Sequence, residues 1–155
     1  MLKLDIGSGP FPIPGFTGVD RYIASDGIVN ANMWELPYAD DSVDEIYSSH
    51  ALEHVEKRMI IPTLKEWRRV LKPGATATLF VPDLEWCCRQ WLERQTNDWY
   101  LDIIFGNQTH PGEFHKTGFT TNLMLGYLGN AGFTEARHGA IEDHEQNTLF
   151  FVVSK

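Results

Sequence analysis

The sequence predicts a single α/β domain built on a mostly parallel β-sheet. Short apolar or β-branched runs recur along the chain, and in its second half they alternate with segments of helical periodicity, the pattern of strands joined by crossover helices. The chain has 155 residues and 43% hydrophobic content, enough for one ordinary domain with a buried core. Since the sequence shows no internal repeat, low-complexity tract or linker, we expect residues 1–155 to form that one domain.

The strands are predicted from the short apolar runs. These lie at residues 2–6, 16–19, 28–30, 43–47, 76–81 and 148–153. The connections at 7–15 and 21–27 are shorter than the stretch of about a dozen residues that a crossover helix needs. We therefore expect the first two connections to be bare loops.

An apolar stripe predicts a helix over residues 62–71. Its members recur at spacings of four, three and four residues, which places them on one helix face. They are Ile60, Leu64, Trp67 and Leu71. Thr63 and Glu66 have the spacing of a capping box at the start, and the Pro-Gly pair at 73–74 supplies a stop signal.

Two further helices are predicted in the second half. The segment 84–95 is amphipathic, with tryptophans on its apolar side. The segment 121–130 places Leu123 and Tyr127 on its inner side, and Gly132 is expected to end it.

Charge and composition exclude several classes of partner. The chain has 13 Lys and Arg against 21 Asp and Glu, a net charge of −8 that would repel a phosphate backbone, so nucleic acid is disfavoured. Its apolar stretches fall far short of the roughly 20 residues of a membrane-spanning helix, and residues 1–7 lack the apolar run of a secretory signal. The only cysteines, Cys87 and Cys88, are adjacent, which suits no disulfide framework and favours a cytoplasmic location.

A glycine turn follows the first predicted strand. Gly7, Ser8 and Gly9 let a nucleotide-like ligand approach main chain at the carboxyl end of that strand. Asp20 ends the second strand, where a carboxylate can accept hydrogen bonds from ribose hydroxyls. The dinucleotide fingerprint fails, because Pro12 stands where a third glycine is required.

Five motifs, in this order, closely resemble those of class I S-adenosylmethionine-dependent methyltransferases, within which the chain looks like a small bacterial and phage group of the type 11 kind. They are LDIGSGP at 4–10, GVD at 18–20, LPYADDSVD at 36–44, SSHALEH at 48–54 and EWRRVLKPG at 66–74. The resemblance implies a Rossmann-like, doubly wound sheet of seven strands. The last strand would be antiparallel and pair in a final hairpin with the segment 133–139.

The resemblance also implies a site for S-adenosylmethionine. The cofactor-binding residues it indicates are Asp5, Gly7, Ser8, Gly9, Asp20, Asn32, Met33, Ser49 and His50. Asp5 would organise the glycine loop, Asp20 would hold the ribose, and Asn32 and Met33 would flank the adenine. The family's usual acid at position 32 is an amide here, whose oxygen still accepts a hydrogen bond.

The substrate half of the site is expected in residues 84–120, as a substrate-binding or lid insertion. His115 is the first candidate for a general base that removes a proton from the methyl acceptor. Asp83 is the second candidate, for orienting substrate. A loop-pinning histidine and a turn-capping aspartate are the alternatives.

The sequence contains one zinc-like motif but does not predict a zinc site. His50, Glu53 and His54 match the His-x-x-Glu-His spacing in which one helix face presents two ligands. They directly follow a predicted strand, and no downstream helix evidently offers a third ligand.

The expected function is methyl transfer to a small-molecule or glycan-linked acceptor. The familiar motifs of cytosine and amino-base methyltransferases are absent after the fourth strand, where Ser48, Ser49 and His50 stand. The alternatives are a cofactor-binding subunit without turnover and another use of the same cofactor, aminopropyl transfer or cleavage. Because the chain starts directly on the first strand, the missing cover of the site is expected from a second copy in a homodimer.

Overall fold

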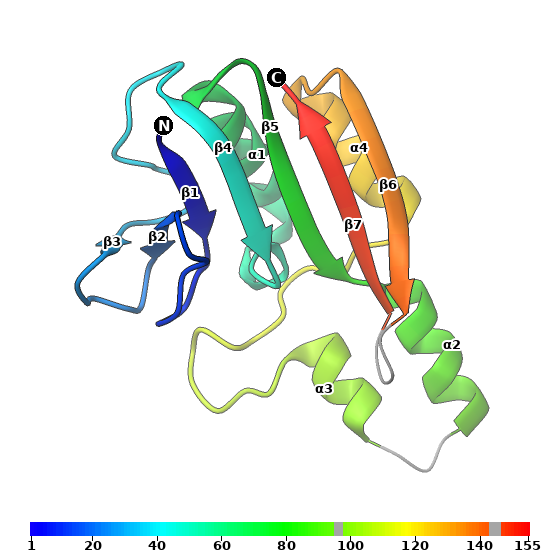
Figure 1. Cartoon of the computed structure of the whole chain (residues 1–155). Coiled ribbons are helices and arrows are strands. Elements are labelled where there is room, and N and C mark those ends of the chain that lie inside the picture. The colour runs from blue at the N-terminus through cyan, green and yellow to red at the C-terminus, as the bar shows by residue number, and fades with distance from the viewer. Residues whose placement is uncertain (95–97, 143–146) are drawn as a thin grey trace.

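The structure is a computed structural model that describes residues 1–94, 98–142 and 147–155. It contains one seven-stranded sheet with the order β3-β2-β1-β4-β5-β7-β6 (Figure 1). Five strands run parallel: β1 (Lys3–Ile6), β2 (Thr17–Asp20), β3 (Ile28–Asn30), β4 (Val43–Ser49) and β5 (Leu71–Pro82). The final hairpin is formed by β6 (Glu135–Glu142) and β7 (Asn147–Ser154).

The strand order confirms the predicted doubly wound, Rossmann-like fold. The chain builds outward from β1 through β2 to β3, then crosses to the other side of β1 and adds β4 and β5. The last strand, β7, pairs antiparallel with both β5 and β6, as predicted. Because the order reverses at β1, the carboxyl ends of β1 and β4 flank the position where open α/β sheets bind ligands.

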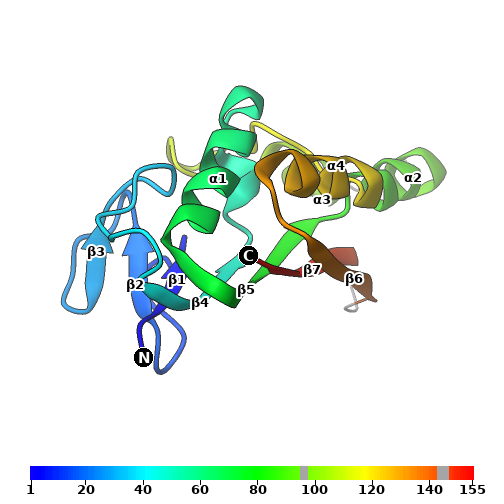
Figure 2. The same ribbon diagram turned by 90° about the horizontal axis from the view of Figure 1, so that it is seen from above.

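Two helices, α1 (Ile60–Val70) and α4 (Thr121–Ala131), cover one face of the sheet (Figure 2). Their buried side chains, among them Trp67 and Met124, join those of the strands in one hydrophobic core. The hydroxyl of Thr120 caps the start of α4, and left-handed Gly132 ends it as predicted. Leu123 was predicted on the inner side of this helix, but it is exposed and its neighbour Met124 is buried.

The predicted capping box of α1 is wrong. The helix starts two residues earlier than predicted, at an N-cap Met59 that makes no side-chain hydrogen bond, and Thr63 is buried inside the helix. Glu66 instead accepts hydrogen bonds from the Leu36 amide at 2.7 Å and from Arg69 at 2.7 and 2.8 Å. These contacts tie α1 to the loop between β3 and β4.

The other face of the sheet is covered by no helix of the described chain (Figure 2). The reason is that the first three connections between strands contain no helix, which confirms the two predicted bare loops. A row of partly exposed rings crosses this face from Phe16 through Tyr47 and Phe80 to Phe150, with centroid separations of 6.3, 5.5 and 6.4 Å. Edge-on and tilted ring contacts of this kind stabilise the pairs beyond the area they bury.

Two helices, α2 (Leu84–Arg94) and α3 (Trp99–Phe105), lie beyond the carboxyl end of β5 (Figure 1). The described residues of α2 agree with the helix predicted there, whereas α3 has seven residues and no extended periodicity and was not predicted. The rings of Trp86 and Tyr100 join the two helices, with centroids 5.9 Å apart. Among the residues that the structure describes, no helix has the length and apolar character that crossing a membrane requires.

Candidate functional site

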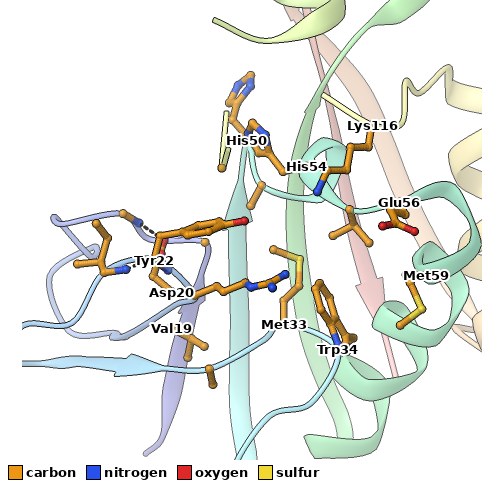
Figure 3. Close-up of a pocket in the computed structure, with 18 of the residues that line it drawn as sticks. Val19, Asp20, Tyr22, Met33, Trp34, His50, His54, Glu56, Met59 and Lys116 are labelled. Atoms are coloured by element: carbon orange, nitrogen blue, oxygen red, sulfur yellow. Dashed lines mark hydrogen bonds between the residues drawn. The ribbon is translucent and has the colours of Figure 1, made fainter. Parts of the chain in front are cut away.

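A cavity of about 490 Å³ lies at the carboxyl ends of β1, β2 and β4 (Figure 3). Its volume falls within the range of about 300–1,000 Å³ that is typical of small-ligand pockets. In Figure 3, Asp20 and Tyr22 lie on one side of the cavity, and Glu56 and Lys116 lie on the other. The cavity stands at the reversal of strand order, where the sequence predicts the cofactor.

The loop after β1 brings bare main chain to this cavity. Gly7 and Gly9 line it, with φ of +77° and +55°. A Cβ on Gly7 would lie 2.2 Å from the Cβ of Ala51, so only glycine fits between this loop and the segment after β4. A Cβ on Gly9 would meet nothing within 4 Å, which leaves room for a ligand beside its backbone.

Asp20 lines the cavity and holds three backbone amides. Its Oδ2 accepts a hydrogen bond from Gly9 at 3.0 Å, and its Oδ1 accepts from Tyr22 at 2.7 Å and Ile23 at 3.1 Å. A carboxylate has about four acceptor positions, so about one remains, on Oδ2. In this arrangement Asp20 has room for one ligand hydroxyl, and a second would have to displace an amide.

Two predicted cofactor residues, Asp5 and Ser8, do not line the cavity. Asp5 is 5% exposed, and its Oδ2 accepts a hydrogen bond from Ile13 at 2.9 Å, which fixes the loop. Burial raises the pKa of the Asp5 carboxyl above its ordinary value, and the Ile13 amide opposes this shift. The Ser8 hydroxyl donates to the Gly9 carbonyl at 3.0 Å.

The loop between β3 and β4 forms a second wall. Met33 and Trp34 line the cavity, whereas Asn32, predicted beside the adenine, does not. The indole N–H of Trp67 on α1 donates to the Met33 carbonyl at 2.9 Å, which attaches this wall to the core. The guanidinium of Arg21 lies 5.4 Å from the centre of the Trp34 ring, within cation–π range.

The residue after β4, His50, lines the cavity with a left-handed backbone. Its φ is +50°, a conformation that residues other than glycine seldom adopt and that concentrates at ligand sites. Its amide donates to the Phe80 carbonyl at 3.0 Å, which holds the turn against β5. Ser49, also predicted for the cofactor, does not line the cavity.

Residues far along the chain complete the cavity, namely His110, Gly112 and Lys116. The His110 ring packs edge-on against Tyr22 with centroids 6.3 Å apart, and a Cβ on Gly112 would lie 2.9 Å from the same ring. The Lys116 amide donates to the Glu53 carbonyl at 2.7 Å. The predicted substrate or lid segment thus contributes to the cavity, and its role as a lid stays a prediction.

His115, the predicted general base, does not line this cavity. Its ring packs edge-on against His54 with 4.8 Å between centroids, and it is His54 that lines the cavity. Burial lowers the pKa of His115 below its ordinary value, and the charge of Glu53 opposes this shift. A catalytic role of His115 stays a prediction. The sequence did not single out His54, whose imidazole lines the cavity, for such a role.

Asp83, the second catalytic candidate, lies outside the cavity at the start of α2. Its Oδ1 accepts hydrogen bonds from the amides of Glu85 at 3.0 Å and Trp86 at 3.2 Å, which are the contacts of a helix cap. Asp83 therefore has the position of the turn-capping alternative.

Burial raises the pKa of the nearby Cys87 thiol to about 12, which disfavours a thiolate there.

Comparison with known proteins finds methyltransferases that are similar to this chain in sequence and in fold. A family described as a methyltransferase domain, Methyltransf_11, matches residues 18–79. A curated protein of Encephalitozoon cuniculi, provisionally named a methyltransferase, is 26% identical over 170 residues, which cover 99% of this chain and 78% of that protein.

Solved structures match the whole fold. A methyltransferase from Methanosarcina mazei that depends on S-adenosylmethionine has a TM-score of 0.70 and 21% identity, covering 99% of this chain and 91% of its own. The 1,6-didemethyltoxoflavin-N1-methyltransferase of Burkholderia thailandensis, solved with 1,6-didemethyltoxoflavin and S-adenosylhomocysteine, has a TM-score of 0.69 and 15% identity, covering 99% and 70%. At such low sequence identities, the structural similarity shows that the chain shares the fold of these proteins.

Proposed function

Because the chain has the matched domain and the fold of the class I S-adenosylmethionine-dependent methyltransferase superfamily, we propose that it transfers a methyl group from this cofactor to a small-molecule or glycan-linked acceptor. The observation that carries the proposal is the cavity at the carboxyl ends of β1, β2 and β4. There, glycine main chain and the Asp20 carboxylate line one wall.

We place the adenosyl part of the cofactor between Asp20 and the loop after β3. The free acceptor position of Asp20 Oδ2 suits a ribose hydroxyl, and Met33 and Trp34 offer an apolar wall for the adenine. The open space beside Gly9 suits the methionine part. Asn32 and Ser49 do not line the cavity, and their contacts with the cofactor remain proposals.

Methyl transfer depends mainly on alignment, because the sulfonium already carries an activated methyl group. A lone pair of the acceptor attacks the methyl carbon, the carbon–sulfur bond breaks, and its electron pair leaves with sulfur as the neutral thioether. Holding the two reactants in line contributes roughly 7–11 kcal/mol to lowering the barrier. We place the acceptor beside His50, His54 and Lys116, and keep His115, whose ring packs edge-on against that of His54, as the proposed base.

Two alternatives predict different products at the same site. A subunit without turnover would bind the cofactor and leave it intact, as the uncovered face of the sheet suggests for a chain that works with a partner. Aminopropyl transfer or cleavage would break a different carbon–sulfur bond and leave methylthioadenosine. Product analysis therefore separates the three.

Transfer of a radiolabelled methyl group tests the proposal. Purified protein is incubated with labelled cofactor and, separately, with nucleotide-sugar, lipid and nucleic-acid pools. We expect label in the nucleotide-sugar or another small-molecule pool, together with S-adenosylhomocysteine. Label in nucleic acid would contradict the acceptor class, and intact cofactor in every pool would contradict turnover.

His115→Ala tests the proposed proton removal. A positioned base is typically worth about 100- to 10,000-fold in rate, so we expect kcat to fall by that order with little change in affinity for S-adenosylhomocysteine. The matched control is His138→Ala, which removes an exposed imidazole from β6. Wild-type rates in His115→Ala would remove this residue as the base.

A further inference from the structure

We propose that Glu53, His54 and His115 form a binding site for one divalent transition-metal cation of the zinc type, in the wall of the cofactor cavity. One ligand atom from each residue lies within 4.8 Å of the other two. Glu53 and His54 belong to the short 3-10 helix η1 (Leu52–His54) that follows β4, and His115 comes from the loop before α4. The metal site rests on the proposed function in one respect only: it lies beside the cavity proposed for the cofactor, which His54 also lines (Figure 3).

The buried carboxylate of Glu53 accepts no hydrogen bond from the part of the chain that the structure describes. The residue is 1% exposed, and neither Oε1 nor Oε2 has such a partner. Nδ1 of His50 stands 3.5 Å from Oε1, within ion-pair range but without hydrogen-bond geometry. A carboxylate removed from water is costly unless a counter-charge or hydrogen bonds replace the water, and a bound cation supplies that charge.

Both imidazoles are held in the way that metal ligands usually are. Nδ1 of His115 lies 2.7 Å from the Ile103 carbonyl oxygen, and Nδ1 of His54 lies 3.2 Å from that of Phe114. A carbonyl oxygen only accepts, so Nδ1 is the donor in each contact, and the neutral ring then has the lone pair of Nε2 for a metal ion. A ring N–H donated to a backbone carbonyl is the common support behind a metal-bound histidine.

The separations require only small movements. Three atoms that lie within 4.8 Å of one another are all within about 2.8 Å of a common point. Since zinc binds nitrogen and oxygen at about 2.0–2.2 Å, each ligand atom has to move by less than about 1 Å. Backbone hydrogen bonds already hold the two ligand-bearing segments together, because the amides of Lys116 and Thr117 donate to the Glu53 carbonyl at 2.7 and 3.1 Å.

The ligand types select the kind of ion. Two imidazoles and one carboxylate suit zinc or another first-row divalent metal, whereas magnesium and calcium prefer oxygen ligands. Of the His-x-x-Glu-His match at His50, Glu53 and His54, the cluster contains Glu53 and His54 but not His50. The third ligand, His115, comes from a loop about sixty residues further on rather than from a downstream helix.

An occupied site changes the role of His115 in the proposed chemistry. His115 would hold the ion rather than remove a proton. The ion would also join the loop that carries Lys116 to the segment after β4, and so fix the acceptor end of the cavity.

Direct metal titration tests this site. Tag-free protein is stripped with a chelator and titrated with zinc by calorimetry and with cobalt(II) by visible absorption, so the readout does not depend on activity. We expect one ion per chain, and binding at least about tenfold weaker in Glu53→Gln, because loss even of a supporting residue typically costs about 10- to 100-fold. His138→Ala, the matched control, should bind as the wild type does.

Titration of the same samples with S-adenosylhomocysteine distinguishes this site from the proposed function. Glu53→Gln should lose zinc and keep S-adenosylhomocysteine, whereas Asp20→Ala should do the reverse. Circular dichroism checks folding, and His115→Ala, which changes a ligand outside the cavity lining, provides the same comparison where Glu53→Gln does not fold. A folded wild type that binds no stoichiometric zinc or cobalt, or equal binding by Glu53→Gln, would overturn the metal site and leave His115 free to act as a base.

Discussion

At the scale of single residues, Asp5 shows how the glycine loop is held. Its carboxyl is buried beneath the loop with one hydrogen bond, from Ile13. Because burial raises its pKa, the folded protein binds this proton more tightly than the unfolded chain does. The resulting stability is full below the ordinary aspartate pKa and is lost as pH rises through the raised pKa of the folded state.

Asp5→Asn removes this titration and keeps an oxygen that accepts from Ile13. We expect a midpoint of thermal unfolding at neutral pH equal to or above that of the wild type, and a flatter dependence of stability on pH just above the ordinary aspartate pKa. Thermal melts across the acid range measure both. A lower midpoint at neutral pH would mean that the charged form stabilises the fold.

Asp44→Asn is the matched control with the opposite sign. A hydrogen bond from Lys72 and another from the Leu2 amide lower the pKa of Asp44 below its ordinary value. Its contribution to stability is therefore present above the ordinary aspartate pKa and is lost as pH falls through the lowered pKa. This variant should be destabilised at neutral pH, where Asp5→Asn is not.

Residues with local roles were the ones that sequence could predict. Gly7 and Gly132 have positive φ, which can be predicted from the local sequence because one glycine lies in a turn and the other follows a helix. Glu66 was assigned to a helix cap, because its true partner, the Leu36 amide, lies 30 positions away. His115 is likewise next to His54 only in the folded chain.

At the scale of elements, the loop after α3 depends on one glycine. Gly106 has φ of +81°, and a Cβ there would lie 1.7 Å from the Glu113 carbonyl oxygen. The loop that this contact closes carries His110 and Gly112, which line the cavity and contact Tyr22. An added methyl group at position 106 must therefore displace this wall of the cavity.

Gly106→Ala should weaken binding of S-adenosylhomocysteine by about tenfold or more, because a preorganised wall would have to be ordered on binding. The matched control is Gly126→Ala in α4, where a Cβ meets nothing within 4 Å and stability should rise by up to about 1 kcal/mol. Calorimetry and thermal melts measure the two effects. Unchanged affinity in Gly106→Ala would exclude this loop from the site.

Elements with a strong local pattern were predicted and the others were not. The parallel strands and the bare early connections follow from apolar runs and their spacing. The short α3 carries no such pattern, and the β6 strand was expected only from the family resemblance. The start of α1 was placed two residues too late because its N-cap, Met59, makes no side-chain hydrogen bond and so carries no capping signal in the sequence.

At the scale of the whole molecule, the uncovered face of the sheet bears on assembly. The partly exposed rings of Tyr47, Phe80 and Phe150 lie on it, and aromatic side chains are enriched at protein interfaces. The homodimer expected from the sequence stays a prediction, and this face is where we place its interface.

Sedimentation velocity tests the dimer. We expect the wild type to sediment at twice the chain mass of 17.7 kDa, and Phe150→Lys to shift toward the monomer because it places a charge among the rings. Leu123→Lys, which changes an exposed residue of α4 on the opposite face, is the control and should remain dimeric. A wild type that stays monomeric at every concentration would contradict the prediction.

The central claim is that the cavity beside Gly9 and Asp20 binds an adenosyl thioether. Calorimetric titration with S-adenosylhomocysteine tests it most directly, with NAD as the competing ligand and the exposed Asp26→Ala as the control variant. Hydrogen bonds to a charged group contribute about 1.5–3 kcal/mol, so Asp20→Ala should bind at least about tenfold more weakly while Asp26→Ala binds as the wild type does. Folded wild-type protein that binds NAD, or does not bind S-adenosylhomocysteine, would contradict the account.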